Sequence, residues 1–193
     1  MPNVQHSVLT DPNLHEPKGV STALEGQVYR ANGSGSGSWR FPSGNAFGEL
    51  YISGGTVAQT LPAASATAKL NPTGGWSANG NANVTLSGPN GTMTVPTAGE
   101  YLLHFWMSFS TASATAGSVY NFHYAVNGVP STRKIIVAKV SNGADKLHVG
   151  ANGYVALSAN DVLTMYVGGD GTTSGTDITP LEAGFSVMLI SPT

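Results

Sequence analysis

From about residue 48 to its end, the chain alternates apolar and polar positions in short runs that close with turn-forming residues. In residues 48–55 (GELYISGG), Leu50 and Ile52 share one side and Tyr51 takes the other. The same period of two recurs in residues 82–88, 91–99, 99–110, 119–131, 133–140, 145–170 and 182–191. This pattern is typical of antiparallel β-strands. We therefore predict an all-β protein, built as an antiparallel sandwich or jelly roll.

Residues 119–131 (VYNFHYAVNGVPS) contain the clearest turn signal. Alternating aromatic and aliphatic residues run through Val126 and are followed by Asn127-Gly128. Asn-Gly between two alternating runs favours a tight hairpin, because both residues accept a positive φ. Residues 60–70 (TLPAASATAKL) could contain a helical turn, although their alanines and threonines do not decide this.

The run 99–110 (GEYLLHFWMSFS) is apolar on both of its faces. One face consists of Tyr101, Leu103, Phe105, Met107 and Phe109, and the other of Leu102, His104, Trp106 and Ser108. Antiparallel sheets commonly bury one face and leave the other in water, where Leu102 and Trp106 would be poorly placed. No helical pattern is present to supply a second layer. We therefore predict that another subunit covers this face.

Residues 1–40 lack such periodicity. Pro12 and Pro17 disfavour a helix, and residues 32–39 (NGSGSGSW) have the composition of a flexible linker. An engineered linker would join two recognisable modules, and the upstream piece is not one. We expect an extended N-terminal arm with its Gly/Ser linker over residues 1–40, and a β-domain over residues 41–193.

Composition narrows the possible functions. The 193 residues include no cysteine, which excludes disulfides, thiolate metal ligands and cysteine nucleophiles. Charged residues make up 9% and the net charge is −2, which gives no electrostatic reason to expect nucleic acid or a membrane as a partner. Sparse charge limits the solubility of a free monomer and suits an assembled protein. Neither a secretory signal pattern nor a membrane-length apolar run is found, so we expect no export by the usual route.

The histidines do not show the spacing of a metal site. His6, His15, His104, His123 and His148 match neither His-x-x-x-His nor His-Glu-x-x-His. In a trimer, three copies of His104 could meet at the threefold axis, and the alternative is an ordinary hydrogen-bonded histidine. Asp170 and Asp177 lie in a glycine-rich stretch without the spacing of a calcium loop. We expect no metal and no cofactor.

No catalytic constellation stands out, so we do not expect an enzyme. The ten Asp and Glu residues include no pair marked out for glycoside hydrolysis. The GSGSG run at 33–37 has neither the preceding strand nor the following helix of a nucleophile elbow or a phosphate loop. Trp39 and Trp76 could stack on a sugar, but we expect them to plug the edges of the sandwich.

Three segments together resemble the trimeric jelly-roll superfamily of tumour necrosis factor and the complement-type globular heads. They are PTAGEYLLHF (96–105), LSANDVLTMYV (157–167) and AGFSVMLI (183–190). Asn160-Asp161 stands where that superfamily usually has Gly-Asp, and both pairs suit a turn. The resemblance implies a homotrimeric, TNF-like jelly roll whose last strand directs Phe185, Val187 and Leu189 inward. For the trimer interface, our candidates are Leu102, His104, Trp106 and Tyr166.

The segment 6–39, with LHEPKGV and GQVYRANGSGSGSW, resembles the start of bacteriophage head-fibre, head-decoration (cement) and tail-fibre-type proteins. The resemblance implies a virion protein on the capsid surface, assembled in the host cytoplasm. Its arm would dock on the major capsid protein, because an extended segment can pair with a neighbour. The candidate attachment residues are His15, Glu16, Lys18 and Trp39.

These observations favour a virion structural protein that decorates or stabilises the capsid as a homotrimer. The alternative is a receptor-binding tail-fibre tip that recognises host surface glycan through its loops. A tail fibre normally carries a shaft of coiled coil or β-helix, and this chain contains none, which favours the head. A polysaccharide-degrading enzyme is the third hypothesis, and it lacks a catalytic constellation.

Overall fold

The computed structural model describes residues 23–31, 34, 37–40, 42, 44–61, 67–72, 74–112, 117–141, 145–169 and 177–193. By its internal contacts the chain divides into two units, Met1–Pro42 and Ser43–Thr193. None of the described residues lies in a helix, so none belongs to a helix that could cross a membrane.

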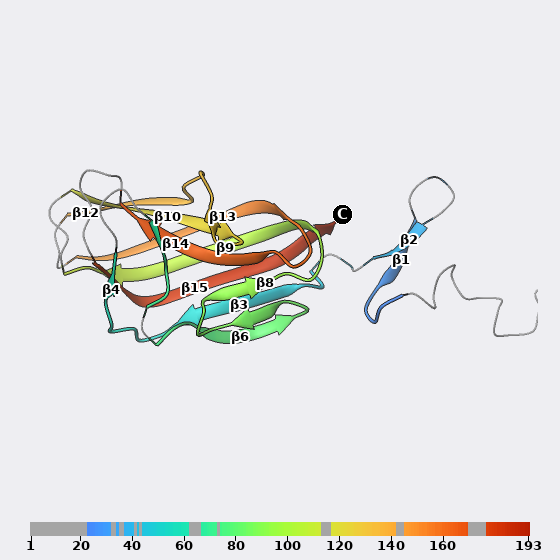
Figure 1. Ribbon diagram of the computed structural model, residues 1–193, viewed down its shortest axis with the longest axis horizontal. Coiled ribbons are helices and arrows are strands. Elements are labelled where there is room, and N and C mark those ends of the chain that lie inside the picture. The colour runs from blue at the N-terminus through green and yellow to red at the C-terminus, as the bar shows by residue number, and fades with distance from the viewer. Residues whose placement is uncertain are drawn as a thin grey trace, which may run out of the picture. The chain divides into compact units, whose positions relative to one another are not determined.

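The larger unit consists of two antiparallel sheets (Figure 1). The six-stranded sheet contains, in spatial order, β13 (Lys146–Leu157), β9 (Gly99–Ser110), β15 (Asp177–Pro192), β3 (Phe47–Ile52) and β6 (Ser77–Ala82), with β4 (Gln59–Thr60) paired to β15. Strand β9 pairs along its whole length with β13 on one side and with β15 on the other.

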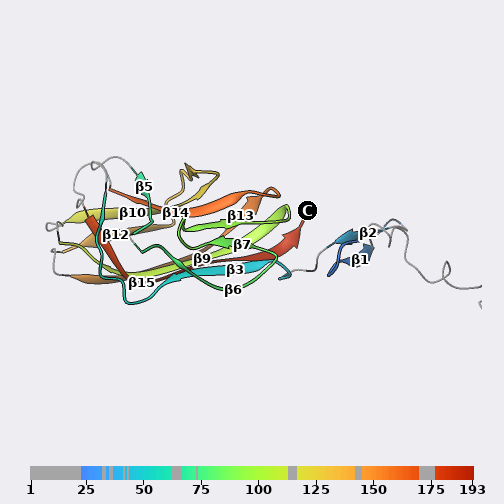
Figure 2. The ribbon, with the colours of Figure 1, turned by 60° about the horizontal axis from the view of Figure 1, so that its bottom comes forward.

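The seven-stranded sheet is the second layer of the sandwich (Figure 2). It contains β11 (Val129–Pro130), β10 (Ser118–Val126), β14 (Val162–Gly168), β8 (Thr92–Thr94) and β7 (Thr85–Ser87), with β12 (Ile136–Val140) paired to β10 and β5 (Thr67–Lys69) paired to β14. The undecided stretch at 60–70 therefore contributes a strand, β5, in its described part.

The core lies between the two sheets and follows the predicted alternation. The inward residues of β9 are at most 6% exposed: Tyr101, Leu103, Phe105, Met107 and Phe109. Phe185, Val187 and Leu189 of β15 are also buried, as predicted. Aromatic rings join the sheets, because Phe122 of β10 lies 5.7 Å from Phe105 and 5.8 Å from Phe109 between ring centroids. Such pairs stabilise a core beyond the area they bury.

The predicted Asn-Gly hairpin is present. Asn127 and Gly128 have φ angles of 53° and 79°, as a tight turn between β10 and β11 requires. The Asn127 side chain also donates to Asp161 at 2.7 Å and accepts from the Val162 backbone N–H at 2.9 Å. This amide therefore ties the hairpin to the turn that precedes β14.

A buried polar cluster holds together the ends of β9, β10 and β15. The Tyr120 hydroxyl donates toward Thr111 Oγ1 at 2.9 Å and the Asp177 carbonyl oxygen at 3.1 Å. Thr111 in turn donates to Asp177 Oδ1 at 3.0 Å. Burial raises the pKa of Tyr120 above its ordinary value. The hydrogen bond to Thr111 lowers this pKa by less, and the charge of Asp177 adds a still smaller increase. The phenol thus remains a proton donor at neutral pH.

We predict that Tyr120→Phe lowers the free energy of unfolding by about 1–2 kcal/mol, because it leaves buried acceptors without their donor. Chemical denaturation measures the loss. Tyr51→Phe is the matched control, since Tyr51 is 37% exposed and its hydroxyl can bond to water. Equal stability of the two variants would contradict the role given to this cluster.

Candidate functional site

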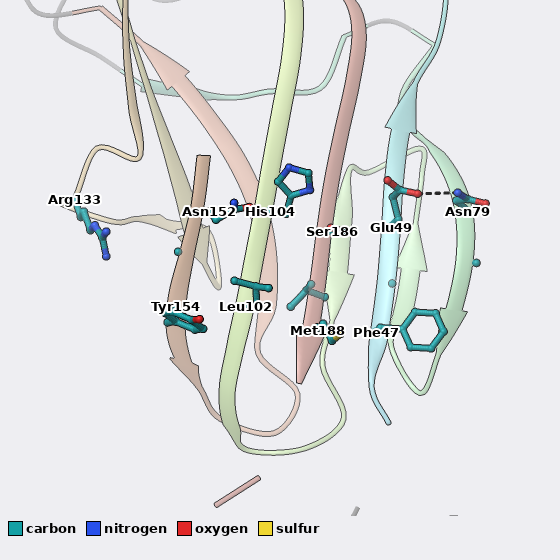
Figure 3. Close-up of a pocket in the computed structure, with 14 residues that line it drawn as sticks. Phe47, Glu49, Asn79, Leu102, His104, Arg133, Asn152, Tyr154, Ser186 and Met188 are labelled. Atoms are coloured by element: carbon teal, nitrogen blue, oxygen red, sulfur yellow. Dashed lines mark hydrogen bonds between the residues drawn. The ribbon is translucent and has the colours of Figure 1, made fainter. Parts of the chain in front are cut away.

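The six-stranded sheet carries a continuous row of apolar side chains on its outer face, the face turned away from the core. Tyr154 of β13 lies opposite Leu102 of β9, Leu102 opposite Met188 of β15, and Met188 opposite Phe47 of β3. Tyr154 is 64% exposed, Phe47 42% and Met188 40%, and Leu102 is half-buried. We call these four residues the apolar row (Figure 3).

A polar row runs beside the apolar row, one step further along the strands. It consists of Asn152, His104, Ser186, Glu49 and Asn79. Asn79 donates to Glu49 Oε2 at 2.7 Å, and His104 is exposed between Asn152 and Ser186 (Figure 3). Within one chain, no three His, Cys, Asp or Glu side chains of the described residues gather as a metal site requires. The meeting of three His104 copies in a trimer stays a hypothesis, with an ordinary hydrogen-bonded histidine as its alternative.

Both rows line one open groove of about 970 Å³. Arg133 stands at the β13 end of this groove, and Glu49 and Asn79 lie toward the other end (Figure 3). The groove is wide and shallow rather than enclosed, and its floor is a sheet. Such a surface suits a macromolecular partner better than a small molecule, which binds in concave sites that bury most of its area.

Trp106 lies further along the same face and is partly covered by its own chain. A Cβ on Gly184 would overlap the indole nitrogen and come within 2.7 Å of Cε2, so only glycine allows the ring to lie against β15. The His148 ring lies 6.3 Å from the indole between centroids, and its Nδ1 is 3.0 Å from Ser108 Oγ. Trp106 therefore needs less cover from another subunit than the sequence suggested.

The structure brings three of the four interface candidates together. Leu102, His104 and Trp106 share the outer face of β9. Tyr166 lies on β14 in the other sheet, opposite His123 and Lys69, and its hydroxyl donates to the Gly128 carbonyl at 3.4 Å. Tyr166 therefore does not line the groove, since the register of β14 turns it outward on the opposite side of the sandwich.

Sequence reasoning missed three members of the apolar row: Tyr154, Met188 and Phe47. The alternation in residues 145–157 and 183–190 carried a signal for the first two, because Tyr154 and Met188 alternate with inward Val155 and Val187. Phe47 lay just before the first recognised strand. No pattern within one segment shows that β13, β9, β15 and β3 become neighbours.

The N-terminal unit contains a short hairpin that the sequence did not predict. β1 (Val28–Ala31) pairs antiparallel with β2 (Gly37–Arg40). Tyr29 lies opposite Trp39, with ring centroids 5.5 Å apart in an edge-to-face contact. Since side chains alternate along a strand, Arg30 and Arg40 occupy the other face of this hairpin. The attachment candidates His15, Glu16 and Lys18 lie outside the described residues.

Two other residues considered for binding, Trp76 and Asp177, already have hydrogen-bond partners within the chain. Trp76 is 5% exposed and donates from Nε1 to the Leu70 carbonyl at 3.0 Å, which confirms that it plugs the sandwich. The Asp177 carboxylate accepts hydrogen bonds from Thr111 and from the Ala112 backbone N–H. Asp170, the other carboxylate of this glycine-rich stretch, lies outside the described residues.

Comparisons with known proteins identify the fold. No protein-family model and no curated protein sequence matches this chain. The solved globular domain of zebrafish complement 1qA protein aligns with a TM-score of 0.52 at 14% identity, over 77% of this chain and 99% of that domain. The fold is a TNF-like jelly roll.

Two further solved structures align less closely. The PRD1 vertex protein P5 has a TM-score of 0.48 at 13% identity, over 78% of this chain and all of that protein. The Eiger TNF protein of S. frugiperda has a TM-score of 0.47 at 14% identity, over 77% of this chain and 95% of that one. A jelly roll supports many functions, so function has to be argued from the surface.

We predict that Gly184→Ala pushes the Trp106 ring off β15. The expected loss is about 1–3 kcal/mol of unfolding free energy, as for other overpacked sites. Tryptophan fluorescence should shift to longer wavelength as the indole becomes more exposed. Gly153→Ala is the control, because a Cβ at Gly153 meets no atom within 4 Å. An unchanged spectrum for Gly184→Ala would show that the ring does not depend on this glycine.

Proposed function

We propose that this protein is a virion structural protein that assembles as a homotrimer through its outer face and decorates or stabilises a phage capsid. The observation that carries self-association is the apolar row. Large exposed apolar patches on soluble proteins mark interaction surfaces. With only 9% charged residues, the remaining surface offers little to keep that patch soluble in a lone monomer.

The composition of the groove supports a protein interface. Aromatic residues and methionine are enriched in the cores of such interfaces, and three of the four members of the apolar row, Tyr154, Met188 and Phe47, are of these types. The polar row beside them provides hydrogen-bonding groups, which interfaces place around an apolar centre. The resemblance of the β-domain to a trimeric superfamily supports three copies as the number.

The hairpin of the N-terminal unit supports a role in attachment. A two-stranded hairpin is marginally stable in water by itself, so a partner that pairs with it or packs on it would stabilise it. Its aromatic face, Tyr29 and Trp39, offers apolar contact, and its cationic face, Arg30 and Arg40, can pair with carboxylates. We extend this role to His15, Glu16 and Lys18.

The mechanism is passive. Each arm would make a modest contact with the major capsid protein, and the trimer would link three arms. Once one arm is bound, the other two act at a high effective concentration, so the complex dissociates far more slowly than a single arm. The resemblance of residues 6–39 to phage head proteins supports the capsid as the partner and the virion surface as the location.

The glycan-binding tail-fibre tip has less support. One of the two tryptophans considered for sugar stacking, Trp76, is buried, and the other, Trp39, contacts Tyr29. A glycan-array screen that finds no ligand agrees with the structural role, and a specific ligand would favour the tip.

We predict that the full chain forms trimers of about 59 kDa, three copies of 19.7 kDa, and sediments with undecorated capsids. A chain lacking residues 1–40 should also be trimeric and should fail to sediment. Analytical ultracentrifugation gives the masses. A monomeric full chain contradicts the trimer, and equal capsid binding by both chains contradicts the anchoring role of the arm.

We predict that Leu102→Asp dissociates the trimer, because it places a charge in the middle of the apolar row. The expected mass is 19.7 kDa with unchanged far-ultraviolet circular dichroism. Val137→Asp is the matched control, since Val137 is 61% exposed on β12 in the other sheet. A trimeric Leu102→Asp variant would rule out the apolar row as the interface.

A further inference from the structure

The groove has opposite charges at its two ends. Arg133 lies in the connection between β11 and β12 and borders the groove beside Tyr154 and Asn152 of β13 (Figure 3). Glu49 lies on β3, with β9 and β15 between it and β13. Neighbouring strands lie about 4.8 Å apart, so β13 and β3 are separated by roughly 14 Å. The two charges are therefore too far apart to pair within one chain.

Both Glu49 and Arg133 have hydrogen-bonding capacity for a partner. Asn79 donates to Glu49 Oε2, and among the described residues no hydrogen bond reaches Oε1. The backbone N–H of Arg133 donates to Ser131 Oγ at 3.0 Å, which fixes the loop beneath the side chain. No ion pair joins the Arg133 guanidinium to any residue that the structure describes. A guanidinium and a carboxylate make strong, directional hydrogen bonds when they meet.

We propose that Arg133 of one copy pairs with Glu49 of the neighbouring copy across the trimer interface. This inference rests on the proposed trimer and names the contact that orients it. A ring of three requires that one patch of a subunit meets a different patch of the next. Opposite charges at the two ends of one groove meet that requirement, because a reversed orientation would bring two cations or two anions together.

The ion pair and the apolar row have different roles in the proposed interface. The apolar row supplies affinity, but apolar contact is non-directional and allows neighbouring copies to slide. An ion pair adds specificity and fixes register, because wrong arrangements leave the charges unpaired. Few other charges compete for these positions in a chain with 9% charged residues. Lys134, next to Arg133, is exposed but does not line the groove.

A charge-swap experiment on the full chain tests the proposal. Arg133→Glu and Glu49→Arg should each raise the protein concentration at which the trimer dissociates by about tenfold or more. The double variant restores opposite charges and should return to within about threefold of the wild-type value. Sedimentation velocity across a dilution series gives these concentrations.

Two controls separate the ion pair from other effects. Lys134→Glu changes the net charge as Arg133→Glu does and should leave the trimer intact. Asn79→Ala removes the hydrogen bond to Glu49 and should weaken the trimer less than Glu49→Arg does. Far-ultraviolet circular dichroism confirms that each variant is folded.

The outcomes distinguish this contact from the trimer itself. A wild-type monomer overturns both. A wild-type trimer that tolerates both single reversals overturns the ion pair and leaves the trimer standing. Two weakened single variants without rescue in the double variant also overturn the pairing. A wild-type mass near 39 kDa, two copies of 19.7 kDa, with rescue would support the ion pair and overturn the number of copies.

Discussion

The pairing of β9 with a neighbouring strand on each of its sides is the constraint on which the rest of the structure depends. All twelve of its residues pair with a strand on each side, so none can shift register without breaking two ladders. Its inward aromatic residues join the core, which turns Leu102, His104 and Trp106 to the outside. The same two ladders bring Tyr154 and Met188 beside Leu102, and β3 adds Phe47 beyond them. The apolar row is thus a consequence of the pairing that builds the core.

Glycine and small polar residues shape the outer face around this row. Gly184 makes room for the Trp106 ring, and Ser186 stands next to His104. Bulkier side chains at these points would raise the surface and prevent a flat approach by another subunit. The face therefore has a line of large apolar side chains, and the small side chains next to this line keep the surface flat. Such a surface suits contact with another protein. Its charges stand at the two ends of the groove, where they can set orientation with little cost to the apolar contact.

The sequence predicted the fold class, the inward residues of β9 and β15, and the Asn127-Gly128 hairpin, because each depends on short-range alternation or on turn chemistry. It placed Leu102, His104 and Trp106 on one outer face for the same reason. It could not assemble the apolar row, since that row is made of strands far apart in the chain. It grouped Tyr166 with the β9 candidates, whereas Tyr166 lies on β14 in the other sheet, because no pattern within its own segment shows which strands become its neighbours. It also missed the β1–β2 hairpin, where a four-residue strand and a Gly/Ser stretch give almost no periodic signal.

The last strand of the chain lies in the middle of the six-stranded sheet. β15 lies between β9 and β3, so these two earlier strands are not joined in one sheet until residues 177–192 pair with both of them. The ribosome synthesises the chain from its N-terminus onward, and pairing between segments that are distant in sequence is slow. The sheet that bears the apolar row is therefore completed only after residues 177–192 have been synthesised. The apolar row does not exist as one surface before that point, so any contact that depends on it can form only after β15 has joined β9 and β3.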